Sequence, residues 1–414
     1  MGTLFPRTGL DRADVQAYLS NARKNDLDWR SGKITGLVYF AGEDVVEVAR
    51  DAYNMFFLEN AIHPRAWPSL GRLESEVVGM TADLLHGGDG AAGSMSSGGT
   101  ESIFLAVKAA RDWTRANRPT AGTPEIVAAR TVHPAFNRAA SYLGLNVVRV
   151  TEDEEYRADV AAMANAVTQN TIMLVGSAPA YPHGVMDPIG ELGELAQSEG
   201  LWLHVDACLG GFIAPFVKKL GYPVPDFDFS VPGVTSISAD IHKSGYSMTK
   251  GASVVLYRDA EYFSHQGFEF DRWPRGQYSS KTFTGSRPGG AVASAWAVMN
   301  YLGEEGYMRV ARQVMQAKQA MVEGVNSIDG LQTWGDPELF IFTFGSRSLD
   351  IFAVADGFAD NGWYVTRIQE PPGMHMMLSL VQAPLVEEFI SDLSHVVEGV
   401  RAGRIVARGT SVSY

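Results

Sequence analysis

Between residues 125 and 206 the chain alternates short apolar segments of strand character with helical segments, and this alternation restricts the fold more than any other feature. Strand character is found at 125–130, 146–150, 171–175 and 201–205. Helical spacing of apolar residues lies between these segments, at 133–143, 159–167 and 189–198. Strands that alternate with helices over short connections favour a mostly parallel sheet covered on both faces. We therefore expect an α/β fold whose ligands gather beyond the carboxyl ends of the strands.

The pattern changes after residue 291, where long helical patterns at 291–302 and 307–328 are followed by short strands and helices. The strands are expected at 340–344, 363–366 and 374–380, with helices at 350–360 and 385–400. A chain of 414 residues exceeds the size at which one core keeps growing. We expect an N-terminal segment (1–60), a large domain (61–299) and a smaller C-terminal α/β domain (300–414) of antiparallel character.

Composition excludes several classes of protein. A net charge of −13 argues against nucleic-acid binding, because no basic stripe is present to neutralise phosphates. The single cysteine, Cys208, rules out an internal disulfide and a multi-cysteine metal site. No signal-type pattern opens the chain, and no stretch is long and apolar enough to span a bilayer. We expect a soluble, cytoplasmic protein that makes at most transient contact with a membrane surface.

A glycine pair precedes the helical pattern at 102–114, in the segment Ser97-Gly-Gly-Thr100. A glycine turn at the start of a helix directs backbone N–H groups at one point and favours an anion, most often phosphate. The alternative is a plain capped helix start, with Thr100 or Ser97 as the N-cap. A helix from 70 to 85 is likewise expected to begin on the loop serine Ser69.

Lys243 stands at the end of a segment of small, β-prone residues, between His242 and a turn at Gly245. A lysine in this place is suited to lie against a bound cofactor, where a desolvated ε-amine acts as a nucleophile. The alternative is a hairpin lysine that points into water.

One ligand accounts for an anion cradle at Gly98–Thr100 together with His133, Asp206 and Lys243. The cradle takes a phosphate, the imidazole stacks on an aromatic ring, the acid holds a ring nitrogen protonated, and the lysine forms a Schiff base with an aldehyde. These features describe pyridoxal 5′-phosphate.

Each of these residues also has a plainer interpretation. Asp206 and His133 are both placed to cap the helices that follow them. His204 is more typical of a residue inside the sheet than of a ligand. Asp240 and His242 offer only two close metal ligands, which is poor evidence for zinc, so no metal site is expected.

Several longer strings carry a resemblance that extends from Tyr39 to about Leu380. These strings are 97–102 (SGGTES), 133–140 (HPAFNRAA), 182–185 (PHGV), 204–211 (HVDACLGG), 233–240 (GVTSISAD), His242-Lys243 and 285–290 (GSRPGG). With them the sequence resembles the sphingosine-1-phosphate lyases, within the pyridoxal-phosphate decarboxylase group of the fold-type I aminotransferase superfamily.

The resemblance implies a role for each matching residue. Lys243 would hold the cofactor, Asp206 would pair with its ring nitrogen, and His133 would stack on the ring. The cofactor phosphate would be bound by Gly99, Thr100 and His242, and by Ser286 of the partner subunit in an obligate homodimer. The phosphate of the substrate would be bound by Tyr39, His63 and Lys250.

The last three residues have ordinary alternatives, namely a strand tyrosine, a loop histidine and a solvated lysine. This chain also departs from the family pattern. It has Lys243-Ser-Gly-Tyr-Ser-Met-Thr-Lys250, where Ser244 replaces an aromatic residue and one extra residue precedes the second lysine. This insertion places the register of Lys250 in question.

The implied reaction is the retro-aldol cleavage of sphingosine 1-phosphate, or another phosphorylated long-chain base, to a long-chain aldehyde and phosphoethanolamine. The alternative within the same fold is an amino-acid decarboxylase, for which Arg272, Arg275 and Arg367 are candidate carboxylate ligands. A non-catalytic binding protein that kept the fold is a third interpretation, and the intact Lys243 argues against it.

Overall fold

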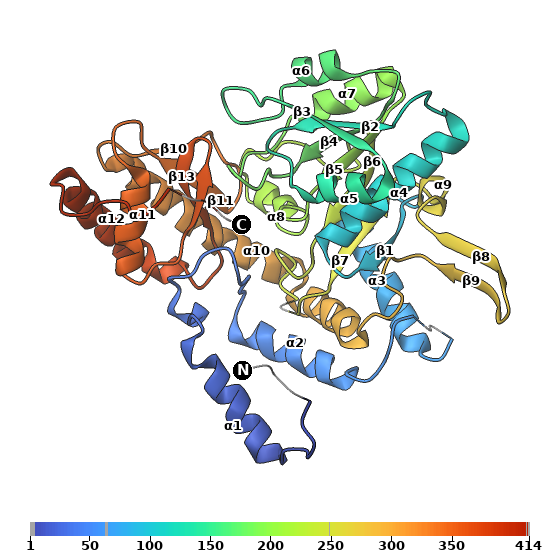
Figure 1. Cartoon of the computed structure of the whole chain (residues 1–414), viewed down its shortest axis with the longest axis horizontal. Helices are drawn as coiled ribbons and strands as arrows, with labels where there is room; N and C mark the ends of the chain where they lie inside the picture. Colours follow the sequence, from blue (N-terminus) through green and yellow to red (C-terminus); the bar gives the residue numbers. More distant parts are fainter. Residues whose placement is uncertain (1–4, 63–64, 248, 411, 413–414) are drawn as a thin grey trace.

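The computed structural model describes residues 5–62, 65–247, 249–410 and 412. A seven-stranded sheet forms the centre of the larger part of the molecule (Figure 1). In spatial order its strands are β1 (Ala92–Ser96), β7 (Ser253–Tyr257), β6 (Val234–Ala239), β5 (Trp202–Asp206), β4 (Thr171–Ser177), β2 (Glu125–Ala129) and β3 (Asn146–Val150). The five strands from β6 to β3 pair in parallel, and β7 runs antiparallel to both of its neighbours. This confirms the mostly parallel α/β fold.

Helices cover both faces of this sheet, and two separate apolar clusters of buried side chains fill the space beneath them. The helices are α3 (Pro68–Leu84), α4 (Gly99–Asn117), α5 (Ala135–Leu143), α6 (Val160–Ala166), α7 (Ile189–Glu199), α8 (Ala214–Lys219) and α9 (Ala260–Ser264). Every residue of β4, β5, β6 and β7 is buried. Strands buried on both faces need continuous apolar or small residues, which explains their unbroken runs in the sequence.

Two helix starts differ from expectation. Helix α4 begins at Gly99 with Gly98 as its N-cap, and no side chain caps it, so neither Ser97 nor Thr100 has that role. Gly98 has a φ of 152°, which glycine adopts without the steric cost of a Cβ. Helix α3 begins at Pro68 rather than after Ser69, because proline suits the first helical position.

The smaller part of the molecule is an antiparallel four-stranded sheet with helices, at the left of Figure 1. Its elements are β10 (Gln332–Thr333), β11 (Ile341–Gly345), β13 (Pro372–Met377), β12 (Thr366–Gln369), α11 (Ile351–Asp360), η3 (Ala383–Leu385) and α12 (Val386–Arg401). The strand expected at 363–366 was wrong, since β12 begins only at Thr366. The N–H of Tyr364 donates to the carbonyl of Lys33, and its carbonyl accepts from Thr35, so this backbone pairs with the N-terminal segment instead.

The long helix α10 (Gly289–Ser327) runs between the two parts and is interrupted at Gly303, where φ is 51° and ψ is −174°. The interruption lies between the two helices expected at 291–302 and 307–328. The expected domain boundary at 299/300 falls inside α10, just before this kink.

The N-terminal segment contains α1 (Arg12–Ala22), η1 (Arg23–Asn25), η2 (Trp29–Ser31) and α2 (Glu43–Met55). Residues 34–40 form an arm of the N-terminal segment. Its Gly36 N–H donates to the carbonyl of Met377, and its Phe40 carbonyl accepts from Leu380. The sequence did not predict β8 (Phe268–Trp273) and β9 (Gly276–Ser280), a hairpin that projects from the large sheet (Figure 1). In the described part of the chain no helix is both long and apolar enough to cross a membrane.

Candidate active site

A cavity of about 390 Å³ lies where the strands of the large sheet end. Asp206 is the last residue of β5, Ser177 the last of β4, and Asp240 follows β6 directly. Seven of the sequence-predicted site residues line the cavity: Gly99, Thr100, His133, Asp206, His242, Lys243 and Lys250. Parallel strands place their carboxyl ends at one edge of the sheet, so residues distant in sequence converge there.

The glycine turn forms the phosphate end of this cavity. A helix leaves its first N–H groups without intrahelical partners, and those of α4 begin at Gly99. A Cβ added to Gly99 would lie 2.7 Å from the sulfur of Cys208 and 2.8 Å from Asp240 Oδ2, so only glycine fits. A Cβ on Gly98 would lie 3.4 Å from Cε1 of His242, which places the imidazole beside the turn. The cradle expected from the sequence therefore has both a helix N-terminus and a histidine.

Glu101 fixes the position of this turn, a role that the sequence did not predict. Its buried carboxylate accepts hydrogen bonds from the N–H and hydroxyl of Ser97. On the other side it accepts from the N–H groups of Phe283 (2.8 Å) and Thr284 (3.1 Å). The glycine turn and the segment that leads to Ser286 are thus held by one side chain.

Lys243 does not point freely into water. Its ε-nitrogen lies 2.8 Å from Oδ2 of Asp240, whose side chain is fully buried, and the lysine side chain is 28% exposed, facing the cavity. Burial disfavours the charge of Lys243, but the charges of Asp240, Cys208 and Tyr39, with the hydrogen bond to Asp240, together outweigh burial and raise the pKa of the amine. Burial likewise opposes the charge of Asp240, and Lys243 and His242 together lower the pKa of that carboxyl. The sequence suggested a desolvated amine, whereas the structure gives it a buried counter-ion.

Asp206 is buried, and its Oδ1 accepts hydrogen bonds from the Cys208 N–H (3.1 Å) and the Ser238 hydroxyl (3.4 Å). The first contact lies in a turn and caps no helix, because the next helix, α8, begins only at Ala214. The helix cap considered as an alternative for Asp206 is therefore wrong, and the carboxylate lines the cavity.

His133 lines the cavity as well, and its Nδ1 accepts from the N–H of Ala135, the first residue of α5, at 3.1 Å, although the N-cap position is Pro134. Burial lowers the pKa of this imidazole. A neutral ring that uses Nδ1 as an acceptor carries its proton on Nε2. His204, by contrast, is enclosed between the hydroxyls of Ser236 and Ser238, as expected of a sheet residue.

The residues expected to bind the substrate phosphate differ in their position relative to the cavity. Lys250 lines the cavity, so the extra residue before it does not remove it from the site. Its ammonium lies 5.4 Å from the centre of the Tyr39 ring, and burial, followed by the charge of Lys243, lowers its pKa. The Tyr39 hydroxyl contacts the sulfur of Met377 at 2.8 Å and is not part of the cavity lining. His63 lies outside the described residues.

Ser286 does not line the cavity of its own chain. Its hydroxyl accepts from Nδ2 of Asn60 at 2.9 Å, and Oδ1 of Asn60 accepts from the Arg287 N–H.

Asp240 and Tyr181 are among the cavity residues to which the sequence assigned no role in the site, and Asp240 was considered only as half of a weak metal pair. The ring of Tyr181 stacks on His375 of β13, with centroids 4.6 Å apart, and its carbonyl lies 2.9 Å from Nε2 of that histidine. The cavity wall therefore contacts the small sheet. The motif at 182–185, just after Tyr181, was the available signal.

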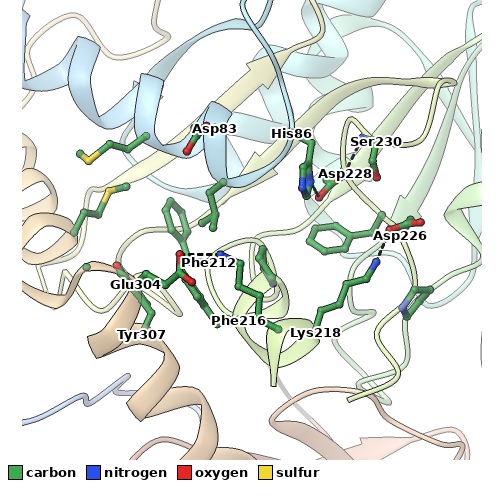
Figure 2. Close-up of a pocket in the computed structure, with 18 residues that line it drawn as sticks. Asp83, His86, Phe212, Phe216, Lys218, Asp226, Asp228, Ser230, Glu304 and Tyr307 are labelled. Carbon is green, nitrogen blue, oxygen red and sulfur yellow. Dashed lines mark hydrogen bonds and ion pairs between the residues drawn. The ribbon is translucent and has the colours of Figure 1, made fainter. Parts of the chain in front are cut away.

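A second cavity, of about 530 Å³, lies between α3, α8 and α10 (Figure 2). Its rim carries the ion pairs His86–Asp228, Lys218–Asp226 and Lys219–Glu304. None of the sequence-predicted site residues lines it. Its wall residue Tyr307 donates from its hydroxyl to the carbonyl of Gly245 at 2.9 Å, in the turn after Lys243.

The residues of the first cavity fit pyridoxal phosphate. Nδ1 of His242 is buried and has no hydrogen-bond partner among the described residues, as expected of a group that awaits an anion. The glycine turn leaves room for a phosphate, and an acid and a lysine stand at neighbouring strand ends. Fold and cavity together define an enzyme that uses this cofactor.

Comparison with known proteins supports this assignment to a pyridoxal phosphate enzyme. The model of the pyridoxal-dependent decarboxylase conserved domain matches residues 31–344. The chain is 44% identical over 407 residues to the sphingosine-1-phosphate lyase of Arabidopsis thaliana, covering 96% of this chain and 74% of the plant protein. The corresponding protein of Oryza sativa is 43% identical over 408 residues, with 97% and 75% covered.

A solved structure of sphingosine-1-phosphate lyase from Burkholderia pseudomallei superposes with a TM-score of 0.93, at 40% identity, covering 98% of this chain and 94% of that chain. The chain belongs to the pyridoxal-dependent decarboxylase family and, within it, to the sphingosine-1-phosphate lyases. It is a pyridoxal phosphate-dependent lyase.

Proposed function

We propose that the protein cleaves sphingosine 1-phosphate, or another phosphorylated long-chain base, to a long-chain aldehyde and phosphoethanolamine. One observation carries this assignment: the cavity holds a second cation, Lys250, in addition to the glycine cradle and Lys243. One phosphate belongs to the cofactor, so a further cationic group suits a substrate that brings its own phosphate. The lyases to which this chain is similar act, by their names, on such a molecule.

The reaction breaks the bond between C2 and C3 of the substrate. The hydroxyl at C3 loses its proton as that carbon becomes an aldehyde, and C2 gains a proton. Bound here, pyridoxal phosphate supplies a ring that takes up the electron pair left at C2.

Each residue has a part in this proposal. Asp206 holds a proton at the ring nitrogen, and His133, kept neutral by burial, offers a flat face to the ring. Lys243 binds the cofactor aldehyde and, when released, carries a proton to or from the reacting carbon. Gly99, Thr100 and His242 hold the cofactor phosphate, while Tyr39, His63 and Lys250 bind that of the substrate.

The test is direct. Purified protein loaded with pyridoxal phosphate is incubated with dihydrosphingosine phosphate, and aldehyde and phosphoethanolamine are measured by mass spectrometry. The Lys243→Ala variant is the control and should form neither product. Turnover of free amino acids to amines and carbon dioxide, without cleavage of the phosphorylated base, would overturn the proposal.

The decarboxylase alternative needs a cationic ligand for a substrate carboxylate. Arg367 is engaged with Asp356 at 2.7 Å, and Arg272 and Arg275 belong to the exposed β8–β9 hairpin. Among the described residues that line the cavity there is no arginine. These positions favour the lyase reaction.

We also propose that the protein acts as a homodimer in the cytoplasm. Helix α1 has no buried residue, and every residue of β8 is exposed. Large apolar side chains are exposed on both and at the end of α2, among them Tyr18, Leu19, Met55, Phe57, Leu58, Phe268 and Trp273. A helix without packing partners and an isolated hairpin are only marginally stable in water. We therefore infer that a second copy of the chain packs against these surfaces. The active site would then receive Ser286 from the partner subunit.

A further inference from the structure

Asp240 is the only acid seen in an ion pair with the cofactor lysine in the described part of the chain. It follows the last residue of β6, three positions before Lys243, and the turn between them closes with a hydrogen bond from the Lys243 N–H to the Asp240 carbonyl. Its side chain is 0% exposed, and its Oδ2 lies 2.8 Å from the amine of Lys243 and 3.8 Å from Nε2 of His242. Gly99 lies beside this carboxylate, since a Cβ added to Gly99 would come within 2.8 Å of Oδ2.

A carboxylate that is buried away from solvent needs a positively charged partner, because a buried unpaired charge costs several kcal/mol of folding free energy by general estimates. Burial lowers the pKa of His242, although the charge of Asp240 opposes this. The amine of Lys243 also lies nearer to Oδ2 of Asp240 (2.8 Å) than Nε2 of His242 does (3.8 Å), so Lys243 is the main cation beside the carboxylate. The other titratable groups that face this pair are His133 from the loop after β2, Cys208 from the loop after β5, Tyr39 from the N-terminal arm, and Lys250. In the described part of the chain, Asp240 is the group that forms an ion pair with Lys243.

We propose that Asp240 is a positioning residue that holds the amine of Lys243 as an ammonium ion, aimed into the cavity, whenever that amine carries no covalent partner. This rests on the assignment of Lys243 as the cofactor lysine in the proposed function. Capture of an aldehyde forms a C–N bond and expels water, and it needs the unprotonated amine. The ammonium must therefore first give its proton to solvent and surrender its ion pair, so Asp240 controls how readily the free lysine reacts.

The test measures the lysine itself in cofactor-free protein. Acetic anhydride labels unprotonated amines, and mass spectrometry of the peptide that contains Lys243 gives the labelling rate from pH 7 to 12, a range that includes the midpoint of a lysine model peptide. We expect the midpoint of the wild-type profile to lie above that of a lysine model peptide. In Asp240→Asn the midpoint should fall by one pH unit or more, so labelling at pH 8 rises about tenfold.

Asp206→Asn is the matched control, since Asp206 is a buried carboxylate of the same cavity without an ion pair to Lys243, and its profile should follow the wild type. Asp240→Glu, which keeps the charge, should restore a raised midpoint. If Asp240→Asn does not fold, the wild-type profile still decides: a midpoint at or below that of the peptide overturns the proposal. An unchanged midpoint in folded Asp240→Asn overturns it too.

Borohydride reduction of the holoenzyme tests the underlying assignment separately. Cofactor fixed at a residue other than Lys243 would refute the cofactor role, whatever the labelling profile shows.

Discussion

At the scale of single residues, side chains of the site both hydrogen-bond to the backbone and line the cavity. His133 accepts a hydrogen bond from the N–H of Ala135, and Asp206 accepts one from the N–H of Cys208, while both line the cavity. These contacts fix the side chains before any ligand arrives, which reduces the ordering cost of binding.

Lys250 permits a test of the substrate phosphate site. Lys250→Met should raise KM for dihydrosphingosine phosphate by about 10- to 100-fold, because a hydrogen bond to a charged group contributes roughly 1.5–3 kcal/mol. Steady-state kinetics and a cofactor titration measure the two effects, and cofactor affinity should change little. Lys24→Met, at an exposed position outside the site, is the control. A loss of cofactor affinity with unchanged KM would assign Lys250 to the cofactor instead.

At the scale of elements, the kink in α10 gives a clear expectation. Gly303 has a φ of 51°, which disfavours any residue with a Cβ. Gly303→Ala should lower the free energy of unfolding by about 1 kcal/mol or more, measured by urea denaturation.

Gly190, in the first turn of α7, is the matched control because a Cβ there meets nothing within 4 Å. Gly190→Ala should leave stability equal or up to about 1 kcal/mol higher. Equal stability of the two variants would mean that the kink carries no strain.

The sequence predicted the helices and strands that have a clear apolar pattern. It missed those whose position is set by contacts between distant segments or by a residue without a side-chain signal. The β–α alternation predicted β2, β4 and β5 nearly to the residue, because buried strands are continuous apolar runs. It also predicted β3, a partly exposed strand at the edge of the sheet. The start of α4 was missed because a glycine N-cap leaves no side-chain signature. The β8–β9 hairpin, exposed throughout β8, has no core-facing pattern to recognise.

The site was predicted in the same uneven way. Motif residues with known chemistry, such as Lys243 and Asp206, were predicted to be at the cavity and line it. Asp240 was set aside as half of a weak metal pair, because its ion pair depends on how the turn folds. The contact between Tyr39 and Met377 joins distant segments, which no local pattern reports.

At the scale of the whole molecule, the proposed dimer can be tested by mixing two impaired variants. Lys243→Ala lacks the proposed cofactor lysine, and Ser286→Ala lacks the hydroxyl proposed to act in the partner's site. Refolding them together should restore about a quarter of the wild-type sites, because half of the dimers are mixed and each has one complete site. Activity at limiting cofactor is the measurement. No recovery, with mixed dimers present, would place Ser286 in its own chain's site.

Stability should also depend on pH through three buried histidines. Burial lowers the pKa of His183, His204 and His375 to about 4 each, from an ordinary 6.5. The unfolded chain therefore binds more protons than the folded one between pH 4 and 6.5, so stability present above pH 6.5 is lost as the pH falls to about 4. Each histidine contributes on the order of 3 kcal/mol to this loss. Urea denaturation at pH 7 and pH 5 measures the loss of unfolding free energy. An equal free energy of unfolding at the two pH values would contradict the prediction.

The N-terminal arm has a consequence for how the enzyme is made. Tyr39, proposed to serve the substrate, contacts Met377, which lies 338 positions later in the chain. A ribosome synthesises the tyrosine near the beginning of translation and its neighbour near the end. The emerging polypeptide can therefore close the glycine turn and the lysine turn first, and it completes the wall around Tyr39 only once strand β13 has been made.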